Sequence, residues 1–386
     1  MYTTISDSLR DLTDEAQGPH AMQLLVRDLV SALAATWASL VIVHRASPIV
    51  SIEDNYDRLH YPKDGAARDA RYTRYVSETM VLRTQTSAMV PPLLGSLSAS
   101  ASPPSDVLLA CPGLVYRRDT IDRLHTGEPH QVDLWRVRRG SRLSTRDLQA
   151  MIDVVVATAL PGCRSRCVDA RHPYTTDGLQ IDAHVGGEWV EIGECGLALP
   201  ALLAESGLDP RDHSGLAMGL GLDRLLMLRK GIDDIRLLRS KDPRVERQLL
   251  DLSRYTPVSK HPPIRRDLSI VVPDADTPED LGDRVRLALG DDASSVEAVE
   301  VRAETRHREL PREAAKRLAI EPGEKNVLVR VVLRDLERTL TNDEANLLRD
   351  RIYAALHRGR VHEWARGTPP PHHLGEAKSR DGRPNK

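Results

Sequence analysis

The sequence predicts an α+β fold with two folded units: an antiparallel sheet flanked by helices, and a smaller C-terminal βαββαβ unit. At 386 residues the chain is long enough for two or three domains with separate cores. Apolar residues alternate at period two in several segments between residues 107 and 228, and helical spacing accompanies them. Further along, predicted strands at Asp267–Val272 and Val327–Leu333 alternate with predicted helices at Thr277–Leu289 and Asn342–His357.

Composition restricts the class of protein. The formal net charge is -2 with 28% charged residues, so any nucleic-acid-binding surface must be local. No apolar run reaches the ~20 residues that cross a bilayer. The N-terminal residues MYTTISDSLRDL resemble neither a secretory signal nor a transit peptide. Four cysteines without metal-ligand spacing indicate reduced thiols, so we expect a cytoplasmic protein with no membrane contact.

Changes in pattern along the chain predict its organisation. We expect an N-terminal helical segment at 1–45, a main domain at 46–240, a linker at 241–254, a C-terminal domain at 255–367 and a disordered tail at 368–386. In the first segment, the spacing of Met22, Leu25, Leu29 and Leu33 fits one face of a helix. Residues 144–160 are also helical in pattern, with Ser144 or Thr145 as the cap.

The stretch from Gly215 to Ser240 carries the clearest ligand-binding pattern. Small residues alternate with apolar ones up to Leu222, and the glycines leave one face of the predicted strand bare. A helix then begins near Asp223, carries Arg224 in its first turn and ends at Gly231. A bare strand leading into an arginine-bearing helix suits a planar, phosphate-bearing ligand such as ATP. The alternative is an ordinary buried strand with Arg224 in a structural ion pair.

Polar residues gather in three other segments. Residues 81–90 place Gln85, Thr86 and Ser87 after a strand, where they could bind a polar ligand or cap a helix. Between Val107 and Val137, two predicted strands flank a loop whose polar side chains could hold a triphosphate, Mg²⁺ and an ammonium group, or could form cross-strand ion pairs. These side chains are Arg117, Asp119, His125, His130, Gln131 and Asp133.

Acidic residues follow in the segment from His172 to Leu202. Its alternation predicts two strands around a Val-Gly-Gly-Glu turn at 185–188. Asp182, Glu191 and Glu194 would then line one sheet, and carboxylates on facing strands suit Mg²⁺.

Taken together, these segments resemble a class II aminoacyl-tRNA synthetase, specifically the phenylalanyl enzyme, over nearly the whole chain. SPIVSIEDNYDRLHYPKD is similar to the first class motif, and VLRTQTSAM resembles the family's R-T-H-T-S segment. YRRDTID with the following His and HQVD resembles the second motif, and GLGLDRLLMLRKGIDDIRLL the third. The resemblance implies activation of phenylalanine with ATP and Mg²⁺ and its transfer to tRNA.

The resemblance also implies roles for individual residues. Arg117 and Arg224 would be catalytic, Arg117 at the α-phosphate and Arg224 at the γ-phosphate, and Glu191 would help to bind Mg²⁺. The implied ATP-binding residues are Arg117, Asp119, His125, Glu191, Gly219, Gly221 and Arg224. The implied amino-acid-binding residues are Gln85, Thr86, Ser87, Gln131, Asp133, His172, Tyr174 and Ala217, with Gln131 and Asp133 at the ammonium group and Thr86 and Ser87 at the carboxylate.

The chain departs from the family at the amino-acid pocket. Where the family has Phe-Pro-Phe followed by Thr, this sequence has His172-Pro173-Tyr174-Thr175. The family's histidine before Thr-Ser is Gln85, and its glutamine three residues after that serine is Val90. Ala217, which limits ligand size in the family, is retained. We therefore expect intact ATP recognition and altered amino-acid recognition.

The C-terminal unit resembles the ferredoxin-fold anticodon-binding domain of the same family, which opens with P-x-x-x-R-D-L-S. Lys260, Arg265, Arg266, Arg334 and Arg338 could contact the tRNA backbone, although a basic cluster can equally be a solvated face. Both modules on one chain resemble the single-chain organellar form, so we expect a monomer or homodimer that requires no second subunit.

The chain contains no phenylalanine at all. A protein of this size ordinarily has on the order of ten or more. One hypothesis is a reserve or inhibitor-resistant ligase that can be translated when phenylalanine-charged tRNA is scarce. The alternative is an amino-acid-adenylating paralogue that serves a non-tRNA acceptor or a different aromatic amino acid. A third possibility, a catalytically inactive tRNA-binding regulator, is disfavoured by Arg117 and Arg224.

Overall fold

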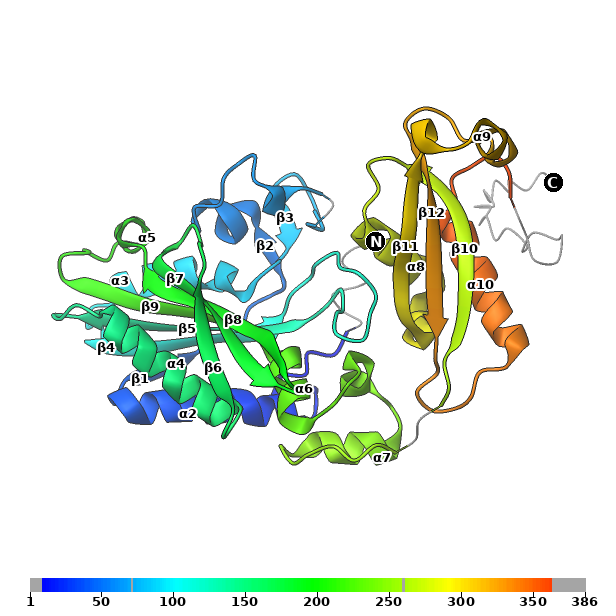
Figure 1. Ribbon diagram of the computed structural model, residues 1–386. Helices are drawn as coiled ribbons and strands as arrows, with labels where there is room; N and C mark the ends of the chain where they lie inside the picture. The colour runs from blue at the N-terminus through cyan, green and yellow to red at the C-terminus, as the bar shows by residue number, and fades with distance from the viewer. Residues whose placement is uncertain (1–8, 71, 259–260, 363–386) are drawn as a thin grey trace, which may run out of the picture.

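The computed structural model describes residues 9–70, 72–258 and 261–362. Its first unit is built on a seven-stranded sheet with the strand order β1-β4-β5-β9-β8-β7-β6 (Figure 1). The strands are β1 (Leu40–Val43), β4 (Asp106–Leu114), β5 (His130–Arg139), β6 (Arg164–Asp169), β7 (Thr175–Val185), β8 (Glu188–Ala198) and β9 (His213–Gly221). Neighbours are antiparallel except for β1, which runs parallel to β4. The antiparallel sheet predicted from residue 107 onward is confirmed, and β1 extends it.

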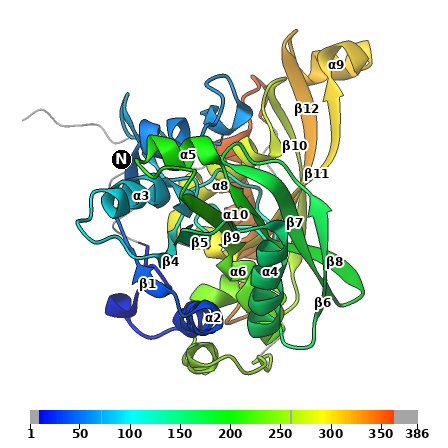
Figure 2. The same cartoon turned by 90° about the vertical axis from the view of Figure 1, so that its left-hand side faces the viewer.

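Three helices cover one face of this sheet: α2 (Ala21–Trp37), α4 (Thr145–Ala159) and α6 (Leu222–Lys230). Helices α2 and α4 lie side by side there (Figure 2). Ser144 caps α4 in a capping box with Asp147, as its position predicts. The apolar stripe of α2 joins Leu216 and Met218 of β9 in one core. The segment predicted as a separate helical region is therefore part of the main domain.

The opposite face of the sheet is covered only in part. Helices α3 (Val90–Ser98) and α5 (Pro200–Glu205) pack there against Trp135 and Ala217. A small sheet of β2 (Ile49–Ser51) and β3 (Met80–Leu82) lies beside them. After β3, a 3₁₀ turn over Thr86–Met89 leads directly into α3.

Glycines shape the centre of the sheet. A Cβ on Gly193 would lie 2.4 Å from the carbonyl oxygen of Gly219, so β8 and β9 need glycine to approach this closely. Gly219 and Gly221 leave space on the open face of β9, while Leu220 points into the core. The predicted hairpin between β7 and β8 is also confirmed, since Gly186 and Gly187 form its turn with φ of 64° and 91°.

The C-terminal unit has a three-stranded sheet in the order β10-β12-β11. Its elements are β10 (Ile264–Pro273), α8 (Pro278–Leu289), β11 (Val296–Arg306), α9 (Arg312–Leu318), β12 (Glu324–Leu333) and α10 (Asn342–Leu356). Apart from the short helix α9 between β11 and β12, the described part of the chain follows βαββα of the expected βαββαβ order. No fourth strand forms within residues 261–362, although the Arg358 amide donates to Val271 O at 2.8 Å, on the outer side of β10 where a fourth strand would pair.

The stretch predicted as a linker is packed structure. Residues 241–254 include α7 (Pro243–Glu246) and bury Val245 and Leu249 in the main core. A free hinge would expose these two apolar side chains to water. Because burying them is favourable, the stretch packs against the first unit. The predicted tail at 368–386 lies outside the described residues.

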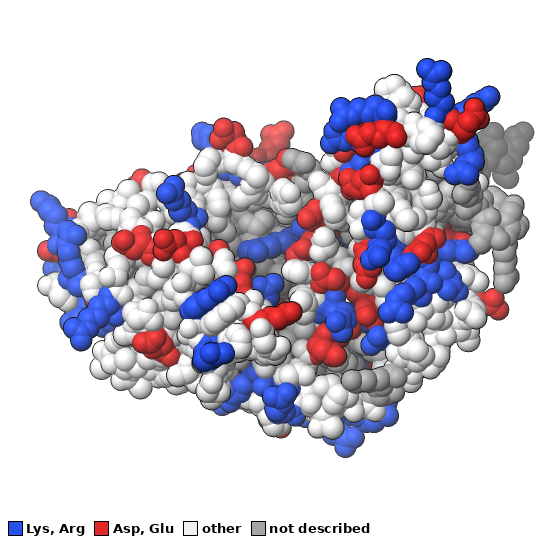
Figure 3. Space-filling model, in the orientation of Figure 1, with Lys and Arg blue, Asp and Glu red and all other residues white. Residues whose placement is uncertain are grey.

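Buried ion pairs join the two units. Arg74 Nη2 lies 3.1 Å from Asp283 Oδ1, and its Nη1 lies 2.6 Å from Glu128 Oε1. From the C-terminal unit, Arg286 donates to the carbonyl oxygens of Asp119 and Thr120. Figure 3 shows a hollow between the units with basic and acidic side chains around it. Among the described helices, none is both long enough and apolar enough to cross a membrane.

Candidate active site

A cavity of about 380 Å³ opens on the uncovered face of the sheet. Its lining comes mainly from the end of the first motif, the β3–α3 junction, the β4–β5 loop with the start of β5, the middle of β8 and the β9–α6 junction, with Tyr174 and Ile235 in addition. The structure brings together here most of the residues predicted from sequence. They are Gln85, Ser87, Arg117, Asp119, His125, Gln131, Asp133, Tyr174, Glu191, Gly219, Gly221 and Arg224. Thr86, His172 and Ala217 do not line it.

Two arginines give the cavity its positive charge. Arg117 Nε donates to Thr84 O at 2.8 Å, which anchors the side chain. Arg224, in the first turn of α6, donates from Nη1 to Glu191 O at 3.0 Å and lies 4.0 Å from Glu191 Oε2. The hydrogen bond of Arg224 goes to a backbone carbonyl, and the nearest carboxylate oxygen is 4.0 Å away. The charge of Arg224 is therefore not neutralised by a close ion pair. Two guanidinium groups in one cavity favour a polyanionic ligand.

The loop between β4 and β5 adds His125 to the cavity wall. His125 Nδ1 lies 2.7 Å from Asp122 Oδ2, and this hydrogen bond raises the pKa of His125 above its ordinary value. Asp119 lines the cavity nearby, with its Oδ1 accepting from the Thr120 amide. A protonated His125 facing the cavity suits phosphate oxygens.

The predicted acidic trio separates. Glu191 and Glu194 line the cavity, but Asp182 is buried outside it, where Arg166 Nε donates to it at 2.9 Å. Burial raises the pKa of Glu191, whereas His172, whose Nε2 lies 2.9 Å from Glu194 Oε2, lowers the pKa of Glu194. Within the described residues, no group of three His, Cys, Asp or Glu side chains could hold a metal ion. Glu191 lies at the cavity wall beside Arg224.

Asp133 lies at the floor of the cavity and is fully buried. Its Oδ2 accepts from Thr86 Oγ1 at 2.7 Å, and its Oδ1 accepts from Ser87 Oγ at 2.9 Å and from Trp135 Nε1 at 3.1 Å. Burial raises the pKa of Asp133, and these donors oppose that change. The two hydroxyls therefore fix a carboxylate and do not cap α3. Thr86 sits behind Asp133, so its predicted contact with a substrate carboxylate is not supported.

Aromatic side chains form the wall next to Asp133. Tyr174 lines the cavity, and its ring stacks on Trp135 with centroids 6.1 Å apart. Burial raises the pKa of Tyr174 well above 10. Ala217 lies in the apolar cluster beneath, opposite Trp135 across β5 and β9. His172 sits behind Glu194. Of the residues that depart from the family, Tyr174 and Gln85 line the cavity directly, whereas His172 and Val90 do not.

Sequence reasoning missed Tyr61. Its hydroxyl donates to Gln85 Oε1 at 2.8 Å, and Gln85 Nε2 in turn donates to Asn55 O at 3.0 Å. Burial raises the pKa of Tyr61 to about 12. An aromatic residue directly before Pro62 at the end of the first motif was the available signal.

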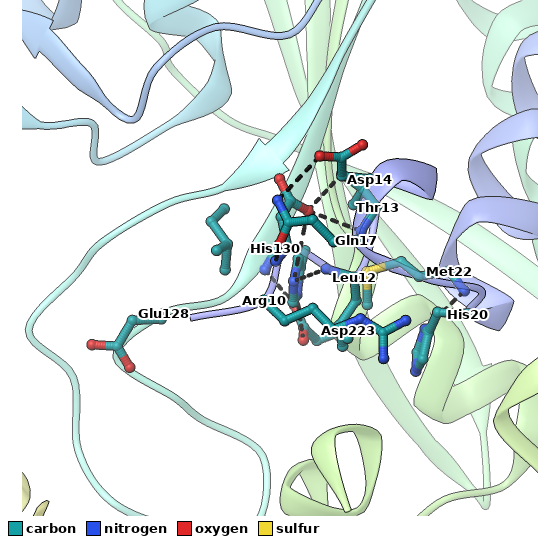
Figure 4. Close-up of polar contacts among 12 residues, drawn as sticks. Arg10, Leu12, Thr13, Asp14, Gln17, His20, Met22, Glu128, His130 and Asp223 are labelled. Atoms are coloured by element: carbon teal, nitrogen blue, oxygen red, sulfur yellow. Dashed lines mark hydrogen bonds and ion pairs between the residues drawn. The ribbon is translucent and has the colours of Figure 1, made fainter. Parts of the chain in front are cut away.

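The contact between His130 and Asp223 was also not predicted from the sequence. The backbone amide and Nδ1 of His130 both face the Asp223 carboxylate, the latter at 3.0 Å (Figure 4). The Leu12 amide donates to His130 Nε2 at 3.0 Å, which leaves Nδ1 to face Asp223. Burial would raise the pKa of Asp223, but His130 and Arg239 hold it below the ordinary value. The pair ties the start of β5, the first turn of α6 and the N-terminal segment together.

The predicted tRNA-binding residues of the C-terminal unit differ in their local surroundings. Arg265 and Arg266 are neighbours on β10 and so point to opposite faces. Arg266 donates to Asn342 and Asn346 of α10. Arg334 Nε lies 2.6 Å from Glu297 Oε2, and Arg338 Nη2 lies 2.9 Å from Glu344 Oε1. Lys260 lies outside the described residues. Local ion pairs thus account for Arg334 and Arg338, and hydrogen bonds to α10 account for Arg266.

Comparison with known proteins agrees with this geometry. The family model "tRNA synthetases class II core domain (F)" matches residues 20–249, and "Ferredoxin-fold anticodon binding domain" matches residues 259–360. The chain is 27% identical over 441 residues to the mitochondrial phenylalanine–tRNA ligase of Saccharomyces cerevisiae, covering 92% of this chain and 90% of that protein.

Bacterial alpha subunits of phenylalanine–tRNA ligase match the first unit. Identity is 34% over 207 residues with the subunit of Streptococcus pyogenes, and 35% over 190 residues with that of Prochlorococcus marinus. These alignments cover 50% and 49% of this chain, and 58% and 54% of the relatives. The chain therefore spans a little over half the length of these subunits.

Proposed function

This chain belongs to the class II tRNA synthetases, and we propose that it activates phenylalanine with ATP and transfers the activated amino acid to tRNA. The observation that carries this proposal is the single cavity that holds both motif arginines, Arg117 and Arg224, beside the buried carboxylate of Asp133. A site for both substrates needs positive charge for the polyphosphate at one end and negative charge for the ammonium group of the amino acid at the other. The similarity to phenylalanine–tRNA ligases supports the choice of amino acid.

The chemistry needs positioning and charge, with no side-chain nucleophile. A carboxylate oxygen of the amino acid attacks the α-phosphorus of ATP, and pyrophosphate leaves. Arg117 neutralises charge at the α-phosphate, while Arg224 and His125 hold the outgoing phosphates. A tRNA ribose hydroxyl then attacks the carbonyl carbon of the adenylate, and AMP leaves.

The amino acid is held by the floor of the cavity. The Asp133 carboxylate accepts the substrate ammonium together with Gln131, and Ser87 lies within reach of the carboxylate. Gly219 and Gly221 give the adenosine a flat surface on β9. Mg²⁺ that arrives with ATP would share Glu191 with the phosphate oxygens and supply charge neutralisation there.

The test is ATP–pyrophosphate exchange with each amino acid, followed by charging of tRNA. Phenylalanine-dependent exchange and phenylalanyl-tRNA formation are expected. Exchange with phenylalanine but no transfer would favour the adenylating paralogue, and no exchange with any amino acid would exclude both. The match to an anticodon-binding domain supports tRNA as the acceptor, since another acceptor would not need that module.

We further propose that this is a reserve or inhibitor-resistant ligase. The chain lacks phenylalanine altogether, so its synthesis does not draw on the pool that it would restore. Tyr174 and Gln85 alter the cavity wall where a phenylalanine-like inhibitor would bind. If exchange by this enzyme is as sensitive to such inhibitors as that of an ordinary phenylalanine–tRNA ligase, resistance is not its role.

We propose that one chain type suffices for activity, as a monomer or homodimer, because a class II core and an anticodon-binding module share the chain. Light scattering on the active purified protein tests this. The cytoplasmic location stays a prediction from the sequence.

A further inference from the structure

Beyond the cavity, the uncovered face of the outer strands β6, β7 and β8 carries a cluster of cationic and aromatic side chains. It consists of Arg164, Arg166, His184 and Trp189, which we call the outer-strand platform. Trp189 is 39% exposed although it is a large apolar residue. None of the roles considered so far uses these residues.

The members of the platform contact one another closely. Arg166 Cζ lies 4.5 Å from the centroid of the Trp189 ring, and the His184 and Trp189 rings are 4.9 Å apart. Arg164 Nη2 lies 3.0 Å from His184 Nδ1. Each guanidinium group is therefore held beside an aromatic ring. This contact restricts the orientation of the guanidinium plane.

Strand register connects the platform to the cavity. Arg164 is opposite His184, and His184 is opposite Trp189; residues directly opposite share a face of the sheet. Trp189 and Glu191 are two positions apart on β8 and share that face, so they lie about 7 Å apart along the strand. Glu191 lines the cavity. The platform is thus a continuation of the active-site floor.

Charge on the platform is positive. Its carboxylate neighbour, Asp182, is only 3% exposed and accepts from Arg166 Nε. In the described part of the chain, no carboxylate pairs with Arg164. A solvent-facing aromatic ring between arginines matches single-stranded nucleic acid, whose bases stack on rings and whose phosphates attract cations. The simpler reading is a cation–π stack that only stabilises the β7–β8 hairpin.

We propose that the outer-strand platform holds the single-stranded 3′ end of tRNA while its last nucleotide enters the cavity. A base stacks on the exposed surface of Trp189, and Arg164 and Arg166 face the phosphates. This inference rests on the proposed function, because it assumes that tRNA is the acceptor. The nucleotides next to the 3′ end of tRNA would thus bind to a surface of the first unit.

The test separates tRNA handling from activation. Trp189→Ala is expected to leave ATP–pyrophosphate exchange within twofold, since that reaction involves no tRNA. Its dissociation constant for intact tRNA should rise about tenfold, the scale of one lost base–aromatic stack. Trp189→Tyr, which keeps an aromatic face, should bind nearly as wild type. Arg164→Ala should weaken binding less and make it less salt-dependent.

A truncated tRNA provides the decisive comparison. Wild-type protein should bind tRNA without its single-stranded 3′ nucleotides more weakly than intact tRNA, and this difference should be smaller for Trp189→Ala. Arg211→Ala, at an exposed arginine near α5, is the matched control and should change neither. An equal loss with intact and truncated tRNA would overturn the proposal, as would a change in oligomeric state without a change in tRNA affinity.

The two proposals fail in different ways. Failure of the proposed function appears as absent exchange or charging by the wild type. Failure of the platform appears in binding, which needs no catalysis. Thermal unfolding of Trp189→Ala guards against a folding defect, and Trp189→Tyr keeps the proposal testable if the alanine variant is unstable.

Discussion

His130 Nδ1 lies 3.0 Å from Asp223 Oδ1, and both residues are buried. His130 precedes Gln131 on β5, and Asp223 precedes Arg224 on α6. The contact between His130 and Asp223 therefore fixes the distance between Gln131, which would bind the amino acid, and Arg224, which would bind phosphate. His130 and Asp223 act as positioning residues.

Replacing Asp223 with Ala should cost about 2–4 kcal/mol of folding free energy, because the His130 amide and Nδ1 lose their acceptor in a buried site. Exchange activity should fall as Arg224 loses its alignment. Urea unfolding and exchange kinetics measure the two effects. Asp223→Asn keeps one acceptor oxygen and should recover part of both. An Asp223→Ala protein with unchanged stability would contradict this account.

Replacing Arg117 with Lys should lower kcat for adenylate formation by about 10²–10³. Lysine keeps the charge but cannot both hold Thr84 O and face the α-phosphate with a planar group. Single-turnover adenylate formation measures the effect, and circular dichroism should show an unchanged fold. A variant that lost only affinity for ATP would place Arg117 away from the reacting phosphate.

Replacing Tyr174 with Phe should lower the KM for phenylalanine roughly tenfold, equivalent to about 1.4 kcal/mol. The change removes a hydroxyl from the aromatic wall without altering the ring that stacks on Trp135. Exchange kinetics across the aromatic amino acids measure it. Tyr61→Phe is the matched control, since its hydroxyl bonds to Gln85 and it should not improve affinity. An unchanged KM would remove Tyr174 from the specificity determinants.

His20 should make stability depend on pH. Its Nδ1 accepts from the Met22 amide at the start of α2, and its Nε2 donates to Leu238 O at 3.2 Å, so the folded protein holds the neutral ring. Burial lowers the pKa of His20 from 6.5 to about 4. The unfolded chain takes up the proton first, so stability is complete above pH 6.5 and falls as the pH drops toward 4.

The loss from His20 should approach about 3 kcal/mol. Urea unfolding at several pH values measures it. His20→Asn keeps a capping acceptor but does not titrate, so its stability should vary less over this range. His307→Asn, in the C-terminal unit and only partly buried, is the control. Parallel pH curves for wild type and His20→Asn would rule out His20 as the cause.

Local patterns in the sequence determined much of the fold and the content of the site. Period-two alternation with glycines defined β9, helical spacing from Asp223 defined the start of α6 to within a residue, and Ser144 marked the cap of α4. These features depend on residues a few positions apart, where backbone preference and side-chain period act directly. Motif order then identified most of the residues that line the cavity.

Only the tertiary structure decided which polar residues reach the cavity. A bulge in β8 leaves Ile192 unpaired and, with strand register, places Glu191 at the cavity while Asp182 is buried under Arg166. Thr86 and Ser87 are adjacent in sequence, yet Ser87 lines the cavity and Thr86 lies behind Asp133.

Long-range pairing decided the rest. The contact of His130 with Asp223 spans 93 residues, and Val245 and Leu249 join a core formed by strands far earlier in the chain. Strand register and burial are set by the free energy of the whole packed core, because one position of shift exchanges the two faces of a strand. Such choices have no signature in any short stretch of sequence.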